Sequence, residues 1–295
     1  MKSPLRQRTP AETRPKDPTD SKHGSSMTTE IQRSDSDGVA VIRFNRPELG
    51  NAFTDSQISS LESALREIAA DASVRVLVLT GNGRHFNVGG IGPPDDYAPA
   101  EWERSPDAHR QQVDGAVRVI RHLHRMPKIT IAAVNGGCAG AGLALALAAD
   151  LRFAATRARF NTAFLDHGVP GELGAIWFAT RLLGPARTRE IFLMPGRIDA
   201  VAAERIGLVN RVIDTNDLLP QVLAIAERIA AARPESLRAM KANLNDALSA
   251  ALDDYLERET DRMIAAAWTA TTQSRRRLGD GLAATEQPSP GTLPN

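Results

Sequence analysis

The hydrophobic positions of this chain alternate between short, nearly continuous apolar runs and longer stretches with helical spacing. Apolar runs predict buried strands at 39–44, 74–80, 129–134 and 151–155, and one more near 207–213. Residues with helical spacing predict helices at 56–71, behind an N-cap at Thr54, and around 107–125. Helices dominate from about 174, and a long helical arm is predicted for 234–272. This alternation predicts an α/β fold with a largely parallel sheet.

Both ends of the chain depart from this pattern. Residues 1–26 are polar and rich in proline and serine, so we expect them to be disordered. Met27 is either the true start, behind a mis-assigned extension, or the first residue after a genuine flexible tail. A flexible tail is also expected at 275–295. Between the tails we expect a core at 27–225 and a helical arm at 226–274.

The composition narrows the class of protein. The chain has 36 basic and 35 acidic residues, and a net charge of +1 argues against nucleic-acid binding. A hydrophobic fraction of 42% is enough for a core, and an aromatic fraction of 4% makes that core aliphatic. Cys138 is the only cysteine, which excludes an intramolecular disulfide and favours a reducing, cytoplasmic location. No apolar run reaches the ~18 residues of a membrane helix, and we expect no membrane partner.

Two glycine-containing bends each follow a predicted buried strand. They are TGNGRHFNVGG (80–90) and NGGCAGAG (135–142). Ligands of parallel α/β sheets bind at the carboxyl ends of strands, although either bend alone is equally well explained as a tight turn. Neither a phosphate loop nor a dinucleotide-binding glycine motif is present.

Longer stretches around these bends carry a family resemblance. They are NRPELGNAF (45–53), GRHFNVGGI (83–91), KITIAAVNGGCAGAGLALALAADLRFAA (128–155), FNTAFLDHGVPGELGAIWFATRLLG (160–184) and PGRIDAVAAERIGLVNRVI (195–213). In order and spacing they resemble the crotonase (enoyl-CoA hydratase/isomerase) superfamily over about 27–245. The resemblance implies a crotonase-like spiral of ββα units with a C-terminal helical trimerisation arm, in a homotrimer or hexamer. It also implies an acyl-CoA thioester as substrate, with no cofactor besides the coenzyme A that the substrate carries.

The resemblance also implies an oxyanion hole. Two backbone N–H groups of the family bind the thioester carbonyl and stabilise an enolate oxygen, and by position these belong to Val88 and Ala141. Small residues allow the carbonyl to approach the backbone closely. The helix that begins near Ala141 adds its positive end to the same oxygen.

The hydratases of the family carry two glutamates that act on water together. The resemblance places them at positions 144 and 164, where this chain has Ala144 and Phe164. Neither side chain can transfer a proton. The resemblance therefore does not support two-glutamate hydration.

One carboxylate does stand at a position that relatives use. Isomerases of the dienoyl-CoA and phenylacetate-pathway types carry an aspartate where this chain has Glu172. A single base suits isomerisation, and we expect burial beside an apolar wall to raise the pKa of Glu172. Alternatively, Glu172 caps the helix that begins near Gly174. Asp166 and His167, in the same loop, are secondary candidates.

Further residues are implied in the acyl-CoA pocket: Arg46, Ala52, Ala144, Phe164, Trp177 and Lys241. Lys241 either meets a CoA phosphate or lies on a solvated helix face. His85 is expected outside the pocket, and Asp150 is expected to cap or pair behind the sheet. The acidic stretch 95–107 is either a lid over the acyl chain or a solvated loop.

Two functions follow from these observations. The first is an enzyme that forms an enolate from an acyl-CoA thioester and is more isomerase-like than hydratase-like, with hydration as the alternative if Glu172 positions water alone or with Asp166. The second is a catalytically inactive acyl-CoA-binding protein, which the two missing glutamates motivate.

Overall fold

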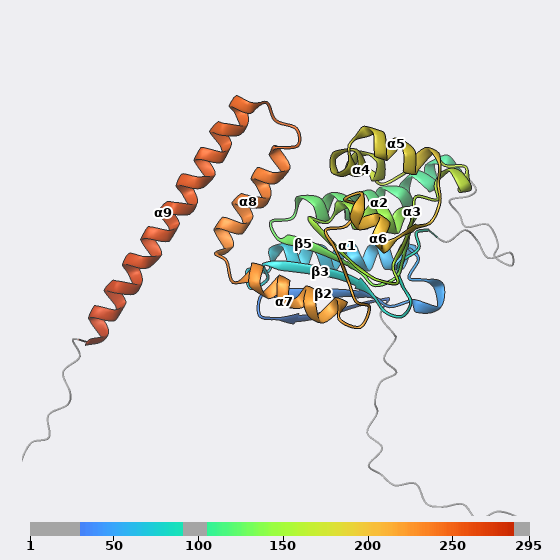
Figure 1. Ribbon diagram of the computed structural model, residues 1–295. Coiled ribbons are helices and arrows are strands. Elements are labelled where there is room, and N and C mark those ends of the chain that lie inside the picture. Colours follow the sequence, from blue (N-terminus) through green and yellow to red (C-terminus); the bar gives the residue numbers. More distant parts are fainter. Residues whose placement is uncertain (1–29, 91–104, 286–295) are drawn as a thin grey trace, which may run out of the picture.

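The computed structural model describes residues 30–90 and 105–285, which form two sheets surrounded by helices (Figure 1). The large sheet has the order β1-β2-β3-β5-β7-β10, and the small sheet has the order β4-β6-β8-β9. The strands of the large sheet are β1 (Ile31–Ser36), β2 (Val39–Phe44), β3 (Val76–Gly81), β5 (Ile129–Val134), β7 (Leu151–Ala155) and β10 (Arg211–Ile213). The small sheet holds β4 (His85–Asn87), β6 (Gly137–Ala139), β8 (Arg159–Asn161) and β9 (Ile198–Asp199).

Nine α-helices are described within residues 30–90 and 105–285, and the last three follow one another without a strand between them. They are α1 (Asp55–Ala70), α2 (Pro106–Arg125), α3 (Gly140–Ala148), α4 (Ala175–Leu183), α5 (Pro185–Leu193), α6 (Ala200–Arg205), α7 (Leu218–Ala230), α8 (Pro234–Asp246) and α9 (Leu252–Thr285). Short 3-10 helices lie at η1 (Pro47–Leu49) and η3 (Leu165–His167). Within 30–90 and 105–285, no helix is long and apolar enough to cross a membrane. The predicted disordered segment 1–26 lies outside the described residues, as does most of the acidic stretch 95–107.

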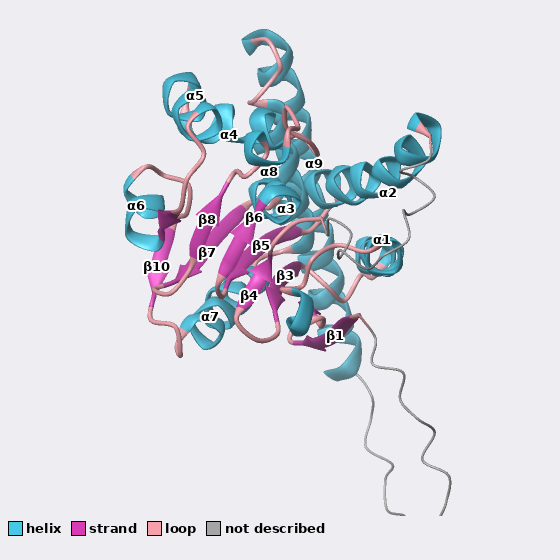
Figure 2. Ribbon diagram, turned by 90° about the vertical axis from the view of Figure 1, so that its right-hand side faces the viewer, coloured by secondary structure: helices cyan, strands magenta, loops and turns pink. Residues whose placement is uncertain are grey.

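Each turn of the fold uses one long strand, one short strand and a helix. The chain passes from β3 to β4 and α2, from β5 to β6 and α3, and from β7 to β8 and α4. The strands β3, β5 and β7 are parallel neighbours in the large sheet, and β4, β6 and β8 are parallel neighbours in the small one. Figure 2 shows the two sets of strands with α3 beside them. The predicted spiral of ββα units is confirmed.

The large sheet separates two hydrophobic cores, because its residues alternate between its faces. One set faces α1, α2 and α3: Ala40, Ile42, Phe44, Leu77, Leu79, Ala132 and Val134. The other faces α7: Val39, Val41, Val76, Val78, Ile131, Ala133 and Phe153. Four residues of α7 are buried in this second core, including Ala226 and Ala230. The expected boundary between 225 and 226 falls within α7, which packs on the core.

Most predicted elements are present, with differences where strands are short. The Thr54 side chain accepts a hydrogen bond from the N–H of Gln57 at 3.1 Å, which confirms the N-cap of α1. The sequence pattern did not reveal β1 or the strands of the small sheet. Of the strand expected at 207–213, only β10 forms. The helix α9 continues to residue 285, beyond the expected end of the arm at 274.

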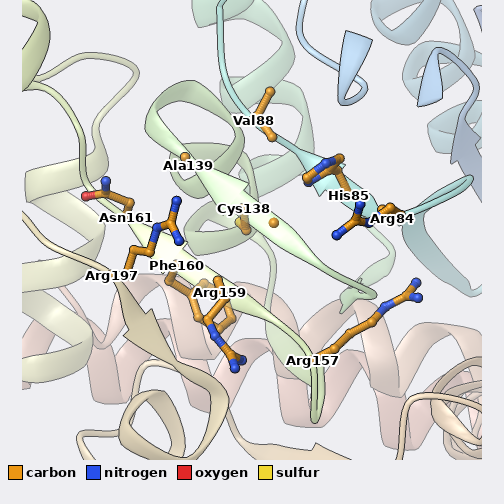
Figure 3. A pocket seen from close by; sticks show the side chains of 11 residues that line it. Arg84, His85, Val88, Cys138, Ala139, Arg157, Arg159, Phe160, Asn161 and Arg197 are labelled. Carbon is orange, nitrogen blue, oxygen red and sulfur yellow. The ribbon is translucent and has the colours of Figure 1, made fainter. Parts of the chain in front are cut away.

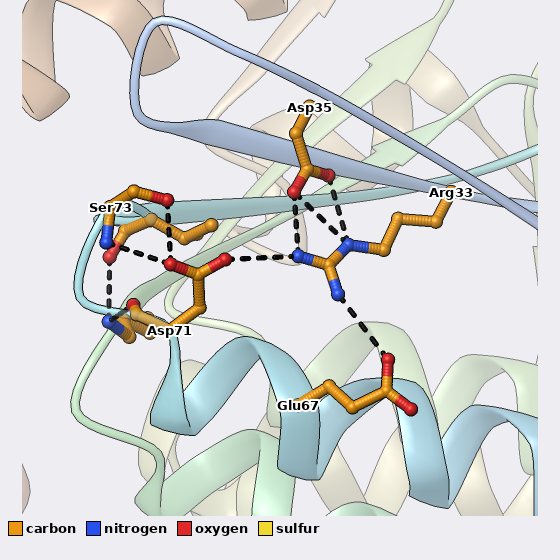
Figure 4. A network of polar contacts seen from close by, with 7 residues as sticks. Arg33, Asp35, Glu67, Asp71 and Ser73 are labelled. Carbon is orange, nitrogen blue, oxygen red and sulfur yellow. Dashed lines mark hydrogen bonds and ion pairs between the residues drawn. The ribbon is translucent and has the colours of Figure 1, made fainter.

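The edge strand β1 is attached to α1 by a group of exposed charges (Figure 4). The Arg33 guanidinium donates to Asp35 at 2.6 Å and lies 3.4 Å from Asp71 and 3.5 Å from Glu67. Asp71 also accepts hydrogen bonds from the Ser73 N–H and hydroxyl, at 2.8 and 2.6 Å. These contacts place β1 against the end of α1 and the turn that leads into β3.

A buried ion pair attaches α8 to the core. The Lys241 ammonium lies 2.9 Å from the Asp150 carboxylate, and Lys241 is only 2% exposed. The ammonium also donates to the carbonyl oxygens of Lys128 at 2.9 Å and Leu123 at 3.3 Å. Asp150 in turn accepts from the N–H and hydroxyl of Thr130, at 2.7 and 2.9 Å. The expectation that Asp150 pairs behind the sheet is confirmed.

The same contacts correct the expectation for Lys241. An ammonium has three donors, and here three acceptors inside the protein use them. No donor remains for a CoA phosphate, and the side chain is not on a solvated helix face. Lys241 is a structural residue.

Replacing Lys241 with methionine is expected to destabilise the protein strongly. The substitution removes the charged partner of the Asp150 carboxylate and the ammonium donor of two carbonyl groups, so unfolding in urea should require about 3–5 kcal/mol less. The matched control is Arg258→Met, which removes a more exposed partner of Asp246 at 3.6 Å and should cost less than about 1 kcal/mol. Equal urea midpoints for Lys241→Met and the unmodified protein would contradict the structural role.

Candidate active site

The two glycine bends lie against each other where β4 ends and α3 begins. A Cβ added to Gly89 would lie 3.0 Å from the Ala139 oxygen and 3.3 Å from the Ala141 nitrogen. A Cβ added to Gly142 would lie 2.1 Å from the Asn87 oxygen, closer than real Cβ atoms come. Gly89 also has a φ of +100°, which favours glycine. The glycines are therefore required by close backbone contact between the two bends.

The second bend presents the N-terminus of a buried helix. α3 follows β6 directly, and its residues from Ala141 to Ala148 are buried. The first N–H groups of a helix have no acceptor within the helix, and that of Ala141 is among them. No acidic residue lies in the first turn, and no side chain caps it. The positive end of the helix is thus available to an oxygen atom that comes close to Ala141.

The first bend differs from the expectation in one contact. The N–H of Val88 donates to the carbonyl oxygen of Gly50 at 3.2 Å, which is at the long end of the range for such bonds. The Val88 side chain covers Gly50, where an added Cβ would lie only 2.8 Å from Cγ2 of Val88. A thioester oxygen on the Val88 N–H must therefore share this donor with Gly50 or displace it.

Two buried asparagines, which the sequence analysis missed, hold the first bend. Asn51 has a φ of +58°, and its side-chain amide donates to the carbonyl of His85 at 2.8 Å. Its side-chain oxygen accepts from the N–H of Arg46 at 2.8 Å. The amide of Asn87 donates to the carbonyl of Asn51 at 2.6 Å, and its oxygen accepts from the N–H of Gly89 at 2.8 Å. The sequence signal for this role was the position of Asn51 and Asn87 beside or within the glycine motifs, since amide side chains can bind backbone groups of a turn.

Ala144 and Phe164, at the positions where the resemblance implies glutamates, lie inside the hydrophobic core. Ala144 is fully buried, and Phe164 is 4% exposed with its ring stacked on that of Phe192 at 5.9 Å. Ala52 is buried in the same way. Burial also raises the pKa of the Cys138 thiol far above its ordinary range, which removes it as a nucleophile. These positions are packed with carbon and supply no group that transfers protons.

Glu172 stands in a strained, exposed turn before α4. Gly171, Leu173 and Gly174 have φ values of +119°, +51° and +73°. A left-handed leucine is costly and persists only where its surroundings require it. The carbonyl of Glu172 accepts the N–H of Ala175 at 3.0 Å, so its backbone forms part of the start of α4.

The exposure of Glu172 corrects one expectation. Glu172 is exposed rather than enclosed by the expected apolar wall. Asp166 and His167 are also exposed, in η3. All three candidates therefore lie at the surface of the described structure.

The remaining pocket candidates have partners of their own. Arg46 forms an ion pair with Glu30 at 3.0 Å. Trp177 is 40% exposed, and the guanidinium of Arg181 lies 3.7 Å from the centroid of its ring. The Trp177 ring also meets the His124 ring in a T-shaped contact, with the ring centroids 5.8 Å apart.

Comparisons with known proteins agree with this fold and these motifs. The sequence model of the enoyl-CoA hydratase/isomerase family matches residues 34–287, and the chain belongs to this family, part of the crotonase superfamily. A probable enoyl-CoA hydratase of Mycobacterium tuberculosis, EchA12, is 37% identical over 75% of this chain and 79% of its own length. The 1,2-epoxyphenylacetyl-CoA isomerase of Escherichia coli is 32% identical over 76% of this chain and 85% of its own.

A solved structure agrees as well. A probable enoyl-CoA hydratase/isomerase of Mycobacterium abscessus has a TM-score of 0.74 and 30% sequence identity, covering 84% of this chain and 96% of its own. The relatives thus include proteins named as hydratases and a protein named as an isomerase. The family is shared, while the named reactions differ.

His124 is expected to make the stability of the protein depend on pH. Burial lowers the pKa of His124 below its ordinary 6.5, and the nearby positive charge of Lys241 lowers it further. Below about pH 6.5 the unfolded chain therefore takes up a proton that the folded chain does not. Stability that is present above this pH should be lost as the pH falls towards 5.

The measurement is the urea midpoint between pH 7.5 and 5. His124→Phe keeps an aromatic ring beside Trp177 and should lose less stability on acidification than the unmodified protein. His167→Gln, which changes an exposed histidine, should follow the unmodified protein. If the unmodified protein and His124→Phe lose stability in parallel, His124 does not carry the effect.

Proposed function

We propose that this protein converts an acyl-CoA thioester through an enolate and that the reaction is an isomerisation. The observation that carries the proposal is the contrast between the two bends and their surroundings. Backbone donors and the N-terminus of α3 meet at Val88 and Ala141, whereas the positions of the hydratase glutamates hold buried Ala144 and Phe164. The site can stabilise negative charge on an oxygen but lacks the pair of carboxylates that activates water.

The proposed reaction needs one base and two oxyanion donors. Glu172 removes a proton from the carbon beside the thioester, and the electron pair moves onto the carbonyl oxygen. The N–H groups of Val88 and Ala141 stabilise that oxygen, and such donors contribute about 3–4 kcal/mol each in other enzymes. Glu172 then returns the proton to a different carbon, so no water is added. No cofactor is needed besides the coenzyme A of the substrate.

Two observations support the choice of isomerisation. Glu172 supplies one carboxylate in the left-handed turn that leads into α4. A relative that is 32% identical over 76% of this chain is named 1,2-epoxyphenylacetyl-CoA isomerase. Because Glu172 is exposed, the proton that it removes exchanges with solvent before a proton is returned, so solvent deuterium enters the product.

The second candidate function is acyl-CoA binding without catalysis. It is favoured by the bond between the Val88 N–H and the Gly50 carbonyl, which occupies one oxyanion donor, and by the exposure of Glu172. In this case the thioester binds through Ala141 and the apolar surface alone, and no proton moves.

We also propose a cytoplasmic homotrimer or hexamer. The helix α9 extends away from the spiral core beside α8 (Figure 1). It exposes large apolar side chains at Leu252, Leu256, Met263, Ile264 and Trp268. A second copy of the chain would cover such a surface. A monomer by light scattering would contradict this assembly.

Glu172→Gln is expected to abolish turnover and preserve binding. The substrate is a 3-enoyl-CoA thioester in deuterated water, and mass spectrometry follows its deuterium content. The unmodified protein should incorporate deuterium without adding water, and Glu172→Gln should do so at least about 100-fold more slowly, because the amide accepts no proton. The matched control is Asp166→Asn, which changes an exposed carboxylate in the neighbouring η3 helix and should keep most of the activity.

The other outcomes separate the alternatives. Full activity of Glu172→Gln would show that Glu172 is not the base. Net addition of water by the unmodified protein would show hydration. A mass that never changes, together with tight thioester binding, would support the binding protein.

A further inference from the structure

A cavity of about 450 Å³ borders the small sheet and is lined by both apolar residues, including Phe160 and Cys138, and arginines. Four arginines border it, together with a histidine and an asparagine: Arg84, Arg157, Arg159, Arg197, His85 and Asn161 (Figure 3). Val88 and Ala139 lie at its border towards the glycine bends. The proposed enolate chemistry uses none of the four arginines.

The small sheet places these arginines on one face. Arg159 begins β8, and Arg197 comes just before β9, which pairs with β8 in antiparallel register. Arg84 precedes β4, and Arg157 lies in the turn between β7 and β8. Phe160 is 1% exposed and points into the core, so the alternation along β8 turns its neighbour Arg159 outwards.

The four guanidinium groups have no acidic partners in the described part of the chain. None of them takes part in an ion pair there, and no carboxylate borders the cavity. Asp199, opposite Arg159 in the register of β9, uses its carboxylate to cap α6 by accepting the N–H of Ala202 at 2.8 Å. The positive charge of the cavity is therefore not neutralised from within.

Two of the arginines are held in place by backbone groups. The Arg157 guanidinium donates to the carbonyls of Asn135 at 2.7 Å and Gly83 at 3.0 Å. The Arg159 guanidinium donates to the carbonyl of Ala158 at 2.7 Å. A guanidinium has five N–H donors, so both keep donors for a ligand while their position is fixed.

His85 provides an independent observation. Its Nδ1 atom is buried, and in the described structure it has no hydrogen-bond partner. The ring lies against Gly137, where an added Cβ would be 2.5 Å from Nδ1. Only glycine at position 137 leaves room for this ring at the wall of the cavity. Buried polar side-chain atoms in folded proteins nearly always have a hydrogen-bond partner, so the Nδ1 atom of His85 is an exception that a bound ligand would explain.

We propose that this cavity binds the diphosphate group of a small molecule. Four uncompensated positive charges repel one another, and a multivalent anion among them removes this cost. Guanidinium groups form paired hydrogen bonds with phosphate oxygens, which favours phosphate as the anion. The volume is in the range of small-ligand pockets rather than of polymer-binding surfaces.

The arrangement of the arginines favours two linked phosphates over one. Figure 3 shows Arg159 and Arg197 on the side of Asn161, and Arg84 and Arg157 on the opposite side with His85. In the proposed site, one phosphate group is bound on each of these two sides. The inference does not depend on the enolate chemistry, since it concerns binding alone.

The test is isothermal titration of the full-length protein with inorganic pyrophosphate at constant ionic strength. Saturable binding of one pyrophosphate per chain is expected. Arg84→Gln and Arg197→Gln should each weaken it by at least about tenfold, because each removes a charge-assisted contact. Neither change breaks a hydrogen bond that holds the fold, and circular dichroism checks folding. The matched control is Arg211→Gln, an exposed arginine of β10 away from the cavity, which should bind as before.

Three results would overturn the proposal. The first is the absence of saturable pyrophosphate binding, also where another copy of the chain covers this face. The second is a loss of affinity in Arg211→Gln equal to that in Arg84→Gln and Arg197→Gln, and the third is that inorganic phosphate binds as tightly as pyrophosphate.

A second titration identifies the source of the diphosphate. The protein is first saturated with a thioether analogue of an acyl-CoA and then titrated with pyrophosphate. Unchanged affinity supports a site for a separate phosphorylated compound. Competition supports a site for the diphosphate of coenzyme A itself. No turnover is measured, so failure of this proposal is distinguishable from failure of the proposed function.

Discussion

The structure depends on the close contact of two backbone bends, one after β4 and one between β6 and α3. Gly89 and Gly142 permit this contact, because a Cβ at either position would meet the backbone of the other bend. The same contact places the first turn of α3 beside the N–H of Val88. It also joins the ends of β4 and β6, which are neighbours in the small sheet. The site is thus a consequence of the packing that forms the fold.

This origin of the site explains its chemistry. A site made of backbone donors needs no ionisable side chain at its centre, and α3 buries alanine and leucine there. Ala144 and Phe164 complete the hydrophobic core beside α3. Glu172, the proposed base, stands in an exposed turn. In the proposed reaction, stabilisation of charge and transfer of protons are therefore supplied by different parts of the fold.

The sequence was sufficient for features that have a local signal. Apolar runs predicted the long strands, and the Thr54 cap marked the start of α1. Strands of two or three residues, such as β9, have too few positions for an alternating pattern, so the small sheet was missed. Lys241 resembled a lysine on a solvated helix, because its burial depends on Asp150, far away in the sequence. The arginine cavity was missed for the same reason, since its four arginines come together only when the small sheet forms.

The central claim is that the two bends polarise a thioester carbonyl. The most direct measurement is the infrared carbonyl stretch of an acyl-CoA thioester labelled with ¹³C at the carbonyl, bound to the unmodified protein. The account predicts that this band moves to lower wavenumber than in water, because two fixed donors and the N-terminus of α3 act on the oxygen. A bound thioester whose band stays at its position in water would contradict the account, whatever the identity of the base.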